Sequence, residues 1–100
     1  MSYSIWYSDI GGVAVERKIL LQNMDKIHTT KMGIDRIKRN LNIKEDVVEF
    51  CKRTIKNSCT IYKKGKNYYV EGNNIRITIN SYSYTIITAH FTKKGEYYGI

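Results

Sequence analysis

Proline is absent from this chain, and cysteine, histidine and tryptophan are scarce, with two, two and one residues among 100. Two cysteines, Cys51 and Cys59, are too few for the disulfide framework that stabilises small secreted proteins. The cysteines and histidines also lack the closely spaced pairs of a zinc site. We therefore expect free thiols, no bound metal and a reducing compartment, the cytoplasm.

Long apolar runs are missing as well. No segment approaches the roughly 20 apolar residues that a membrane-spanning helix needs. Residues 1–9 have neither the basic part nor the apolar part of a signal peptide, so we expect none. The sequence also contains no Walker loop and no glycine-rich dinucleotide turn. These absences argue against a membrane protein and a nucleotide-dependent enzyme, and we expect no cofactor.

Positive charge is the main compositional feature of the chain. The formal net charge is +8, from 17 basic and 9 acidic residues. The segment from Lys26 to Lys66 holds twelve of the basic residues and four of the acidic ones, an excess equal to that of the whole chain. Segregated positive charge attracts phosphate groups and speeds encounter with polyanions. The sequence therefore favours a nucleic acid, RNA first, as partner, with a solvated basic surface without a partner as the alternative.

The first half of the chain has the hydrophobic period of helices. Apolar residues at helical spacing predict three helices, over residues 13–27, 31–41 and 43–57. Thr30 is suited to cap the second helix. Residues 42–45 resemble a capping box that opens the third helix.

The second half alternates between apolar and polar residues, as strands do. We predict four strands, over residues 60–63, 67–71, 74–80 and 84–91. The turns between them are short enough for hairpins. The predicted fold is α+β, with N-terminal helices packed on one face of a C-terminal four-stranded antiparallel sheet. Residues 13–91 form one domain in this interpretation, preceded by an arm (1–12) and followed by a tail or edge strand (92–100).

The last two predicted strands separate an apolar face from a polar face. Side chains alternate across a strand, so Ile75, Ile77 and Ile79 share the face that the helices should cover. The opposite face then gathers polar side chains, namely Arg76, Thr78, Asn80, Tyr84, Thr88 and His90. In this alternation Ile86 lies on the polar face too.

RNA cleavage without a metal needs a base for the ribose 2′-hydroxyl, an acid for the leaving 5′-oxygen, and cations for the phosphate. Histidine suits either proton transfer, and arginine binds phosphate through its planar donor fork. His28 and His90 would form such an acid/base pair if the fold brings them together. The candidate phosphate ligands are Arg36, Arg39 and Arg76. The alternative is that each histidine is an incidental polar residue or a helix cap.

Binding without catalysis is a second hypothesis, directed at RNA, DNA or a nucleoprotein such as a bacterial defence complex. Nine tyrosines offer surfaces that stack on bases. The candidate nucleic-acid-binding residues are Arg39, Lys52, Arg53, Lys64, Lys66, Arg76 and Tyr84.

A third hypothesis is an acidic protein partner, such as an antitoxin. Tyr3, Trp6 and Tyr7 in the N-terminal arm would then mediate contacts or homodimer formation, or else fold back over the core.

Four segments of the chain resemble an uncharacterised family of small bacterial proteins, known as a domain of unknown function. The segments are HTTKMGIDRIKRNL (28–41), DVVEFCK (46–52), KGKNYYV (64–70) and INSYSYTIITAH (79–90). The likeness extends over residues 19–91.

More distantly, the layout resembles the barnase–EndoU–colicin–RelE (BECR) superfamily of metal-independent ribonucleases and toxins. Its members place helices before a four-stranded antiparallel sheet, with the active site on the exposed sheet face. The resemblance implies catalytic roles for His28, Arg36 and Thr88, with His90 as a further polar group on the same strand. It also implies cleavage to a 2′,3′-cyclic phosphate. Some members use a glutamate base, for which we predict no counterpart on the strand face here.

Overall fold

The computed structural model describes residues 16–92, which form helices followed by an antiparallel sheet. Residues 16–22 are helical and lead through the 3-10 turn η2 (Met24–Lys26) to two helices, α2 (Lys31–Leu41) and α3 (Val47–Lys56). The four strands that follow are β1 (Thr60–Lys64), β2 (Asn67–Gly72), β3 (Ile75–Asn80) and β4 (Ile86–Phe91). They pair in the order β1-β2-β3-β4. The predicted α+β fold is confirmed, whereas the predicted arm and nearly all of the predicted tail lie outside the described residues.

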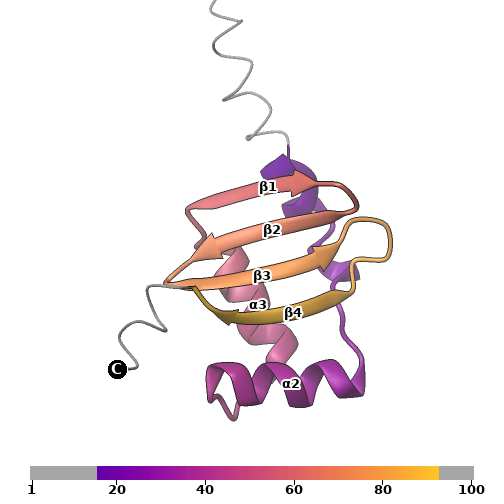
Figure 1. The fold of residues 1–100 in the computed structure, drawn as a ribbon. Helices are drawn as coiled ribbons and strands as arrows, with labels where there is room; N and C mark the ends of the chain where they lie inside the picture. The colour runs from indigo at the N-terminus through magenta and orange to yellow at the C-terminus, as the bar shows by residue number, and fades with distance from the viewer. Residues whose placement is uncertain (1–15, 93–100) are drawn as a thin grey trace, which may run out of the picture.

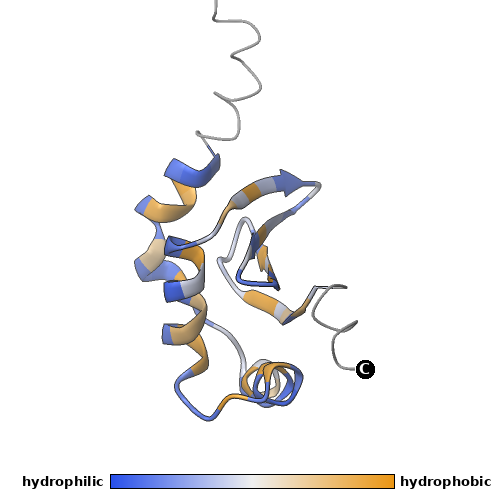
Figure 2. Ribbon diagram, turned by 90° about the vertical axis from the view of Figure 1, so that its left-hand side faces the viewer, coloured by the Kyte–Doolittle hydropathy of each residue, from blue (hydrophilic) through white to orange (hydrophobic). Residues whose placement is uncertain are grey.

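The helices and the sheet form two layers. In Figure 1, α3 lies behind the sheet and α2 lies along its β4 side. Figure 2 shows the same two layers from the side, with α3 beside one face of the sheet and α2 below its β4 edge. Within residues 16–92, every helix is too short or too polar to span a bilayer.

The hydrophobic core fills the space between these layers. It contains apolar residues of the helices together with the inward-facing residues of each strand. The buried hydrophobic residues are Leu20, Ile27, Ile37, Leu41, Val47, Cys51, Ile55, Ile61, Tyr68, Val70, Ile75, Ile77, Ile79, Ile86 and Ala89. Burying one large aliphatic side chain contributes about 1.5–3 kcal/mol. The helices cover the face of the sheet that carries these apolar side chains, so the opposite face stays open.

The helix ends follow from side-chain caps. The Thr30 hydroxyl accepts a hydrogen bond of 3.0 Å from the Gly33 N–H, as predicted for the start of α2. Asn42 closes α2 in the left-handed conformation, with φ 55°, which asparagine tolerates. The predicted start of α3 is therefore wrong, because Asn42 ends one helix instead of opening the next. Asp46 caps α3 and accepts a 3.0 Å hydrogen bond from the Glu49 N–H.

Short turns set the register of the sheet. Asn73 and Asn74, between β2 and β3, both have positive φ, 54° and 63°. Two consecutive residues of this kind form the hairpin turn whose twist matches that of the strands. Gly65, with φ 63°, serves the turn between β1 and β2. The four predicted strands are confirmed, with starts shifted by at most two residues.

Strand β4 departs from simple alternation through a bulge. Thr78 pairs with Thr88, but Ile79 pairs with Ile86, so Ile87 is an extra residue on β4. Ile86 consequently faces the core and is 1% exposed, whereas Ile87 is 40% exposed. The predicted outward position of Ile86 is wrong, because an inserted residue reverses the alternation before it.

Tyr84 is also placed differently from the prediction. It precedes β4 with φ 59° and packs against the core. Its ring centroid lies 6.4 Å from that of Tyr68, a core residue of β2. Tyr84 is therefore not part of the open sheet face, because the chain turns inward before the bulge.

Helix α2 and the residues before it cover the outer edge of β4. His28 and Thr85 form a parallel bridge, and the Thr29 hydroxyl donates to the Ile86 carbonyl at 2.9 Å. At the other end of α2, the Asn40 amide donates to the Ala89 carbonyl at 3.2 Å. An exposed strand edge is a site of unwanted pairing. These contacts close that edge and set α2 alongside the open face of the sheet.

Candidate active site on the open sheet face

A row of three chemically different side chains crosses the open face. The strand register places Glu71 opposite Arg76 and Arg76 opposite His90, on β2, β3 and β4. Their chain neighbours Val70, Ile77 and Ala89 are buried, so these three side chains point to the open side. Adjacent strands lie about 4.8 Å apart, so Glu71 and His90 are separated by roughly 10 Å, with Arg76 between them.

Glu71 and Arg76 form an ion pair within this row. The Nε and Nη2 groups of Arg76 donate to Glu71 Oε2 at 3.0 Å and 2.7 Å. The hydrogen bonds that Arg76 donates to Glu71 raise the pKa of its guanidinium, against the opposing effect of burial. The two side chains are 33% and 43% exposed, so solvent and ligands reach both. Arginine has five N–H donors, and this ion pair occupies only two of them.

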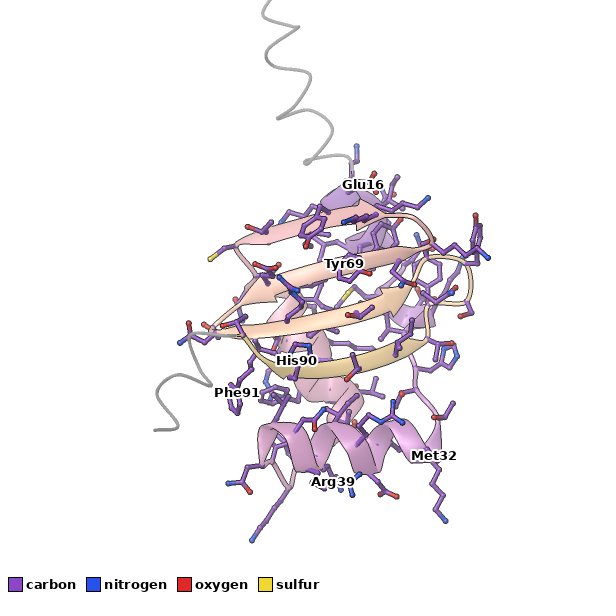
Figure 3. The ribbon with its side chains drawn as sticks, viewed as in Figure 1. Glu16, Met32, Arg39, Tyr69, His90 and Phe91 are labelled. Atoms are coloured by element: carbon purple, nitrogen blue, oxygen red, sulfur yellow. The ribbon has the colours of Figure 1, made fainter. Side chains whose placement is uncertain are left out.

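His90 is oriented by its own strand. Its Nδ1 lies 2.9 Å from the Phe91 carbonyl oxygen. A carbonyl only accepts, so Nδ1 carries the hydrogen and Nε2 is the atom left for proton exchange. The imidazole is half-buried on the open face. Figure 3 shows His90 and Tyr69 on the side of the sheet that faces the viewer.

A second row runs beside the first one on the same face. Tyr62, Tyr69, Thr78 and Thr88 are in register across the four strands. The rings of Tyr62 and Tyr69 stack, with centroids 5.4 Å apart and planes at 24°. Both tyrosines contribute to the raised pKa of Arg76. Arg76 lies two residues before Thr78, the cross-strand partner of Tyr69, so the ion pair and the tyrosine pair are neighbours on this face.

The surface beside Glu71 is hollowed. A depression of about 270 Å³ borders this residue. Its lining comes from the ends of β1 and β2 and from the residues after β4, namely Cys59, Thr60, Gly72, Asn73, Asn74 and Thr92. Within residues 16–92, no three histidine, cysteine or acidic side chains gather closely enough to hold a metal ion.

The structure does not bring together the two histidines, which was the condition for our hypothesis of an acid/base pair. His28 lies beside Thr85, before β4, and His90 lies near the end of β4. Five residues of strand span about 16 Å, so both cannot act on one phosphate. His28 instead uses Nδ1 on the Lys26 carbonyl at 2.9 Å and Nε2 on the Thr85 hydroxyl at 3.1 Å. The paired role is corrected, because α2 starts beside the beginning of β4 and not beside its end.

The predicted arginines of α2 lie on two sides of that helix. Arg36 is exposed and precedes Asn40 by one turn. Residues four apart share a helix face, and Asn40 contacts β4, so Arg36 lies on the β4 side. Arg39 projects from the side of α2 that faces away from the sheet (Figure 3). Of the two, only Arg36 is positioned beside the open face.

The remaining predicted binding residues divide between the two layers. Lys52 and Arg53 belong to α3, behind the sheet, where they pair with Glu49 and Glu45. They are therefore separated from the open face. Lys64 follows Thr60 and Tyr62 by even steps along β1 and extends the open face. Lys66 is exposed in the turn after β1.

Sequence reasoning missed three residues of this face, Glu71, Tyr62 and Tyr69. We predicted no glutamate there, and the strand register overturns that expectation for Glu71. The missing signal was cross-strand register. The short turns fix that register, and they place Glu71 opposite Arg76.

Comparison with known proteins gives a family but no characterised relative. No curated protein and no solved structure matches the chain. A family model described as a protein of unknown function (DUF3781) matches residues 21–90. That range contains the row of Glu71, Arg76 and His90 and most of the described fold. The chain belongs to the DUF3781 family.

Proposed function

We propose that this protein is a metal-independent ribonuclease, with Glu71, Arg76 and His90 as its catalytic residues. The observation that carries the proposal is the register that sets a carboxylate, a guanidinium and an imidazole side by side on one accessible face. The distant BECR resemblance supports it, because members of that superfamily carry the active site on the exposed sheet face. Some of those members also use a glutamate base.

Each side chain has a defined role in the proposed reaction. Glu71 takes the proton of the ribose 2′-hydroxyl, and the 2′-oxygen attacks the phosphorus. Arg76 stabilises the added negative charge on the non-bridging oxygens with its free N–H donors. His90, as imidazolium, gives the Nε2 proton to the 5′-oxygen, and the bond from phosphorus to that oxygen breaks. The products are a 2′,3′-cyclic phosphate and a 5′-hydroxyl.

Two further residues support this chemistry. Thr88 precedes His90 by two residues on β4 and shares its face, so its hydroxyl is available to a phosphate oxygen. Arg36 on α2 supplies a second cation beside β4. His28 has no role at the reacting atoms in this proposal, because both of its ring nitrogens are held at the other end of β4.

The direct test is incubation of the purified protein with labelled total RNA in EDTA. We expect discrete cleavage with cyclic-phosphate ends. Glu71→Gln and His90→Ala should each reduce the rate by about 10²-fold or more, the usual contribution of a positioned acid or base. His28→Ala is the matched control and should cleave at nearly the wild-type rate, with folding of every variant checked by circular dichroism.

The possible outcomes of this experiment differ clearly. Intact RNA with the wild-type protein would overturn it, as would cleavage that survives both Glu71→Gln and His90→Ala. Loss of cleavage in His28→Ala alone would place the site at the other end of β4.

RNA binding without cleavage is the second candidate function. The stacked tyrosine pair favours it, because aromatic rings on an open face bind bases without any chemistry. Salt-dependent binding of RNA that stays intact would support this candidate over the first.

A further inference from the structure

The stacked tyrosines form an apolar platform within an otherwise polar face. Tyr62 and Tyr69 come from adjacent strands, and their rings lie nearly parallel. Their row continues with two threonines, and Lys64 lies beside Tyr62 on the same face. Both tyrosines are half-buried, and α3 lies behind the opposite face of the sheet (Figure 1). The platform is therefore open to a flat ligand.

We propose that Tyr62 and Tyr69 are a base-binding subsite and that the substrate is single-stranded RNA. This inference rests on the proposed function for the position of the scissile phosphate. Residues two apart on a strand are separated by about 7 Å, so the platform lies one such step from the Glu71–Arg76–His90 row. That separation is comparable to the distance between the base and the phosphate of one nucleotide. A phosphate at Arg76 thus brings a neighbouring base onto the rings.

The stacked tyrosines favour single-stranded RNA over duplex RNA. In a duplex, the base faces are hidden in the helical stack, and proteins contact mainly phosphates and 2′-hydroxyls. An aromatic ring on a sheet face can stack on a base only when that base is separated from its neighbours in the nucleic acid. Stacking on aromatic rings tolerates any base sequence. The subsite is therefore specific for unpaired RNA, in single strands or loops, and weakly specific for sequence.

The positive charges near the tyrosine pair also favour single-stranded RNA as the ligand. Arg76 lies two residues before Thr78, the cross-strand partner of Tyr69, and Lys64 lies two residues after Tyr62 at the β1 edge. These cations attract the phosphates that flank a stacked base. Cross-strand aromatic pairs also stabilise sheets. A purely structural pair would leave RNA affinity unchanged when it is replaced, and this difference makes the inference testable.

The test measures binding in a protein that cannot cleave. Fluorescence anisotropy with a labelled single-stranded RNA, and with a duplex of the same sequence, is carried out in the His90→Ala background in EDTA. Adding Tyr69→Thr or Tyr62→Thr should weaken single-strand binding by about ten-fold or more, the loss expected for one stacked base. Duplex binding should change little. Tyr69→Phe keeps the ring and should restore most of the lost affinity.

The control is Tyr82→Thr, which removes a tyrosine from the turn between β3 and β4, where its side chain is 74% exposed. Equal losses for single strands and duplex, or no loss, would overturn the inference. Thermal unfolding of each variant shows that the fold is retained. Failure of the two proposals is distinguishable, because wild-type RNA cleavage tests the nuclease and affinity in the non-cleaving background tests the platform.

Discussion

The Cys51 thiol on α3 is 0% exposed, and burial raises its pKa from 9.0 to about 12. The folded state therefore keeps the thiol neutral between pH 9 and 12, whereas the unfolded chain ionises it. Unfolding is favoured as pH rises through this range, by up to about 1.4 kcal/mol per pH unit. In urea unfolding at pH 8, 9 and 10, we expect the free energy of unfolding to fall more steeply for wild type than for Cys51→Ala.

The matched control for this residue is Cys59→Ala. Cys59 is exposed, so its replacement should leave the pH dependence of stability unchanged. Parallel curves for wild type and Cys51→Ala above pH 9 would contradict the prediction. Tyrosines and lysines also titrate in this range, and the comparison between variants removes their common contribution.

Single residues also show what the sequence could say about the candidate site. Alternation alone placed Arg76, Thr88 and His90 on the polar face, and the structure confirms these positions. It could not place Glu71, because the partner of a strand residue depends on the register that the turns impose. It also could not separate His28 from His90, because that distance depends on how α2 lies along β4.

At the scale of elements, Gly33 leaves room for the Thr29 side chain, which joins the chain before α2 to β4. A Cβ at this buried position would overlap the Thr29 hydroxyl oxygen, which donates to the Ile86 carbonyl. Gly33→Ala should therefore destabilise the protein by about 1–2 kcal/mol, through the lost hydrogen bond and the displaced side chain. Alanine would otherwise favour the helix by about 1 kcal/mol. Chemical denaturation measures the difference.

A double-mutant cycle isolates the cause of this effect. In the Thr29→Ala background the overlap with the Thr29 hydroxyl is removed, and the Thr30 hydroxyl oxygen at 3.2 Å is the close contact that remains. Gly33→Ala should therefore become neutral or stabilising, by up to about 1 kcal/mol. The same destabilisation in both backgrounds would show that the Thr29 contact is not responsible. Distant, independent sites would give additive changes.

Elements also differ in how well their boundaries could be predicted. The bounds of α2 were correct, because the Thr30 cap and the apolar spacing agree. The start of α3 was wrong, since Asn42 and Asp46 both suit a helix boundary and only the left-handed backbone of Asn42 decides between them. The bulge at Ile87 has no signal in a run of β-branched residues, which fit a strand on either face.

At the scale of the whole molecule, positive charge lies in both layers, but only one layer carries the candidate site. The helical layer neutralises part of its charge, since Lys52 and Arg53 pair with glutamates of the same region. The open face offers Lys64, and α2 adds Arg36 beside that face; neither forms an ion pair with any other residue in the range 16–92. The net charge predicted a polyanion partner but not the surface it meets, because that surface is decided by which face the helices cover.

This division predicts which lysines RNA contacts. Each phosphate contact that is lost should lower the slope of log affinity against log salt concentration by about 0.7 for a single strand. Lys64→Gln, on the open face, should show this decrease, measured by anisotropy with single-stranded RNA between low and moderate salt. Lys56→Gln, which removes an exposed lysine of α3, should leave the slope unchanged. Equal slope changes for both lysines would mean that RNA is attracted by net charge alone, and a change confined to Lys56 would move the interface to the helical layer.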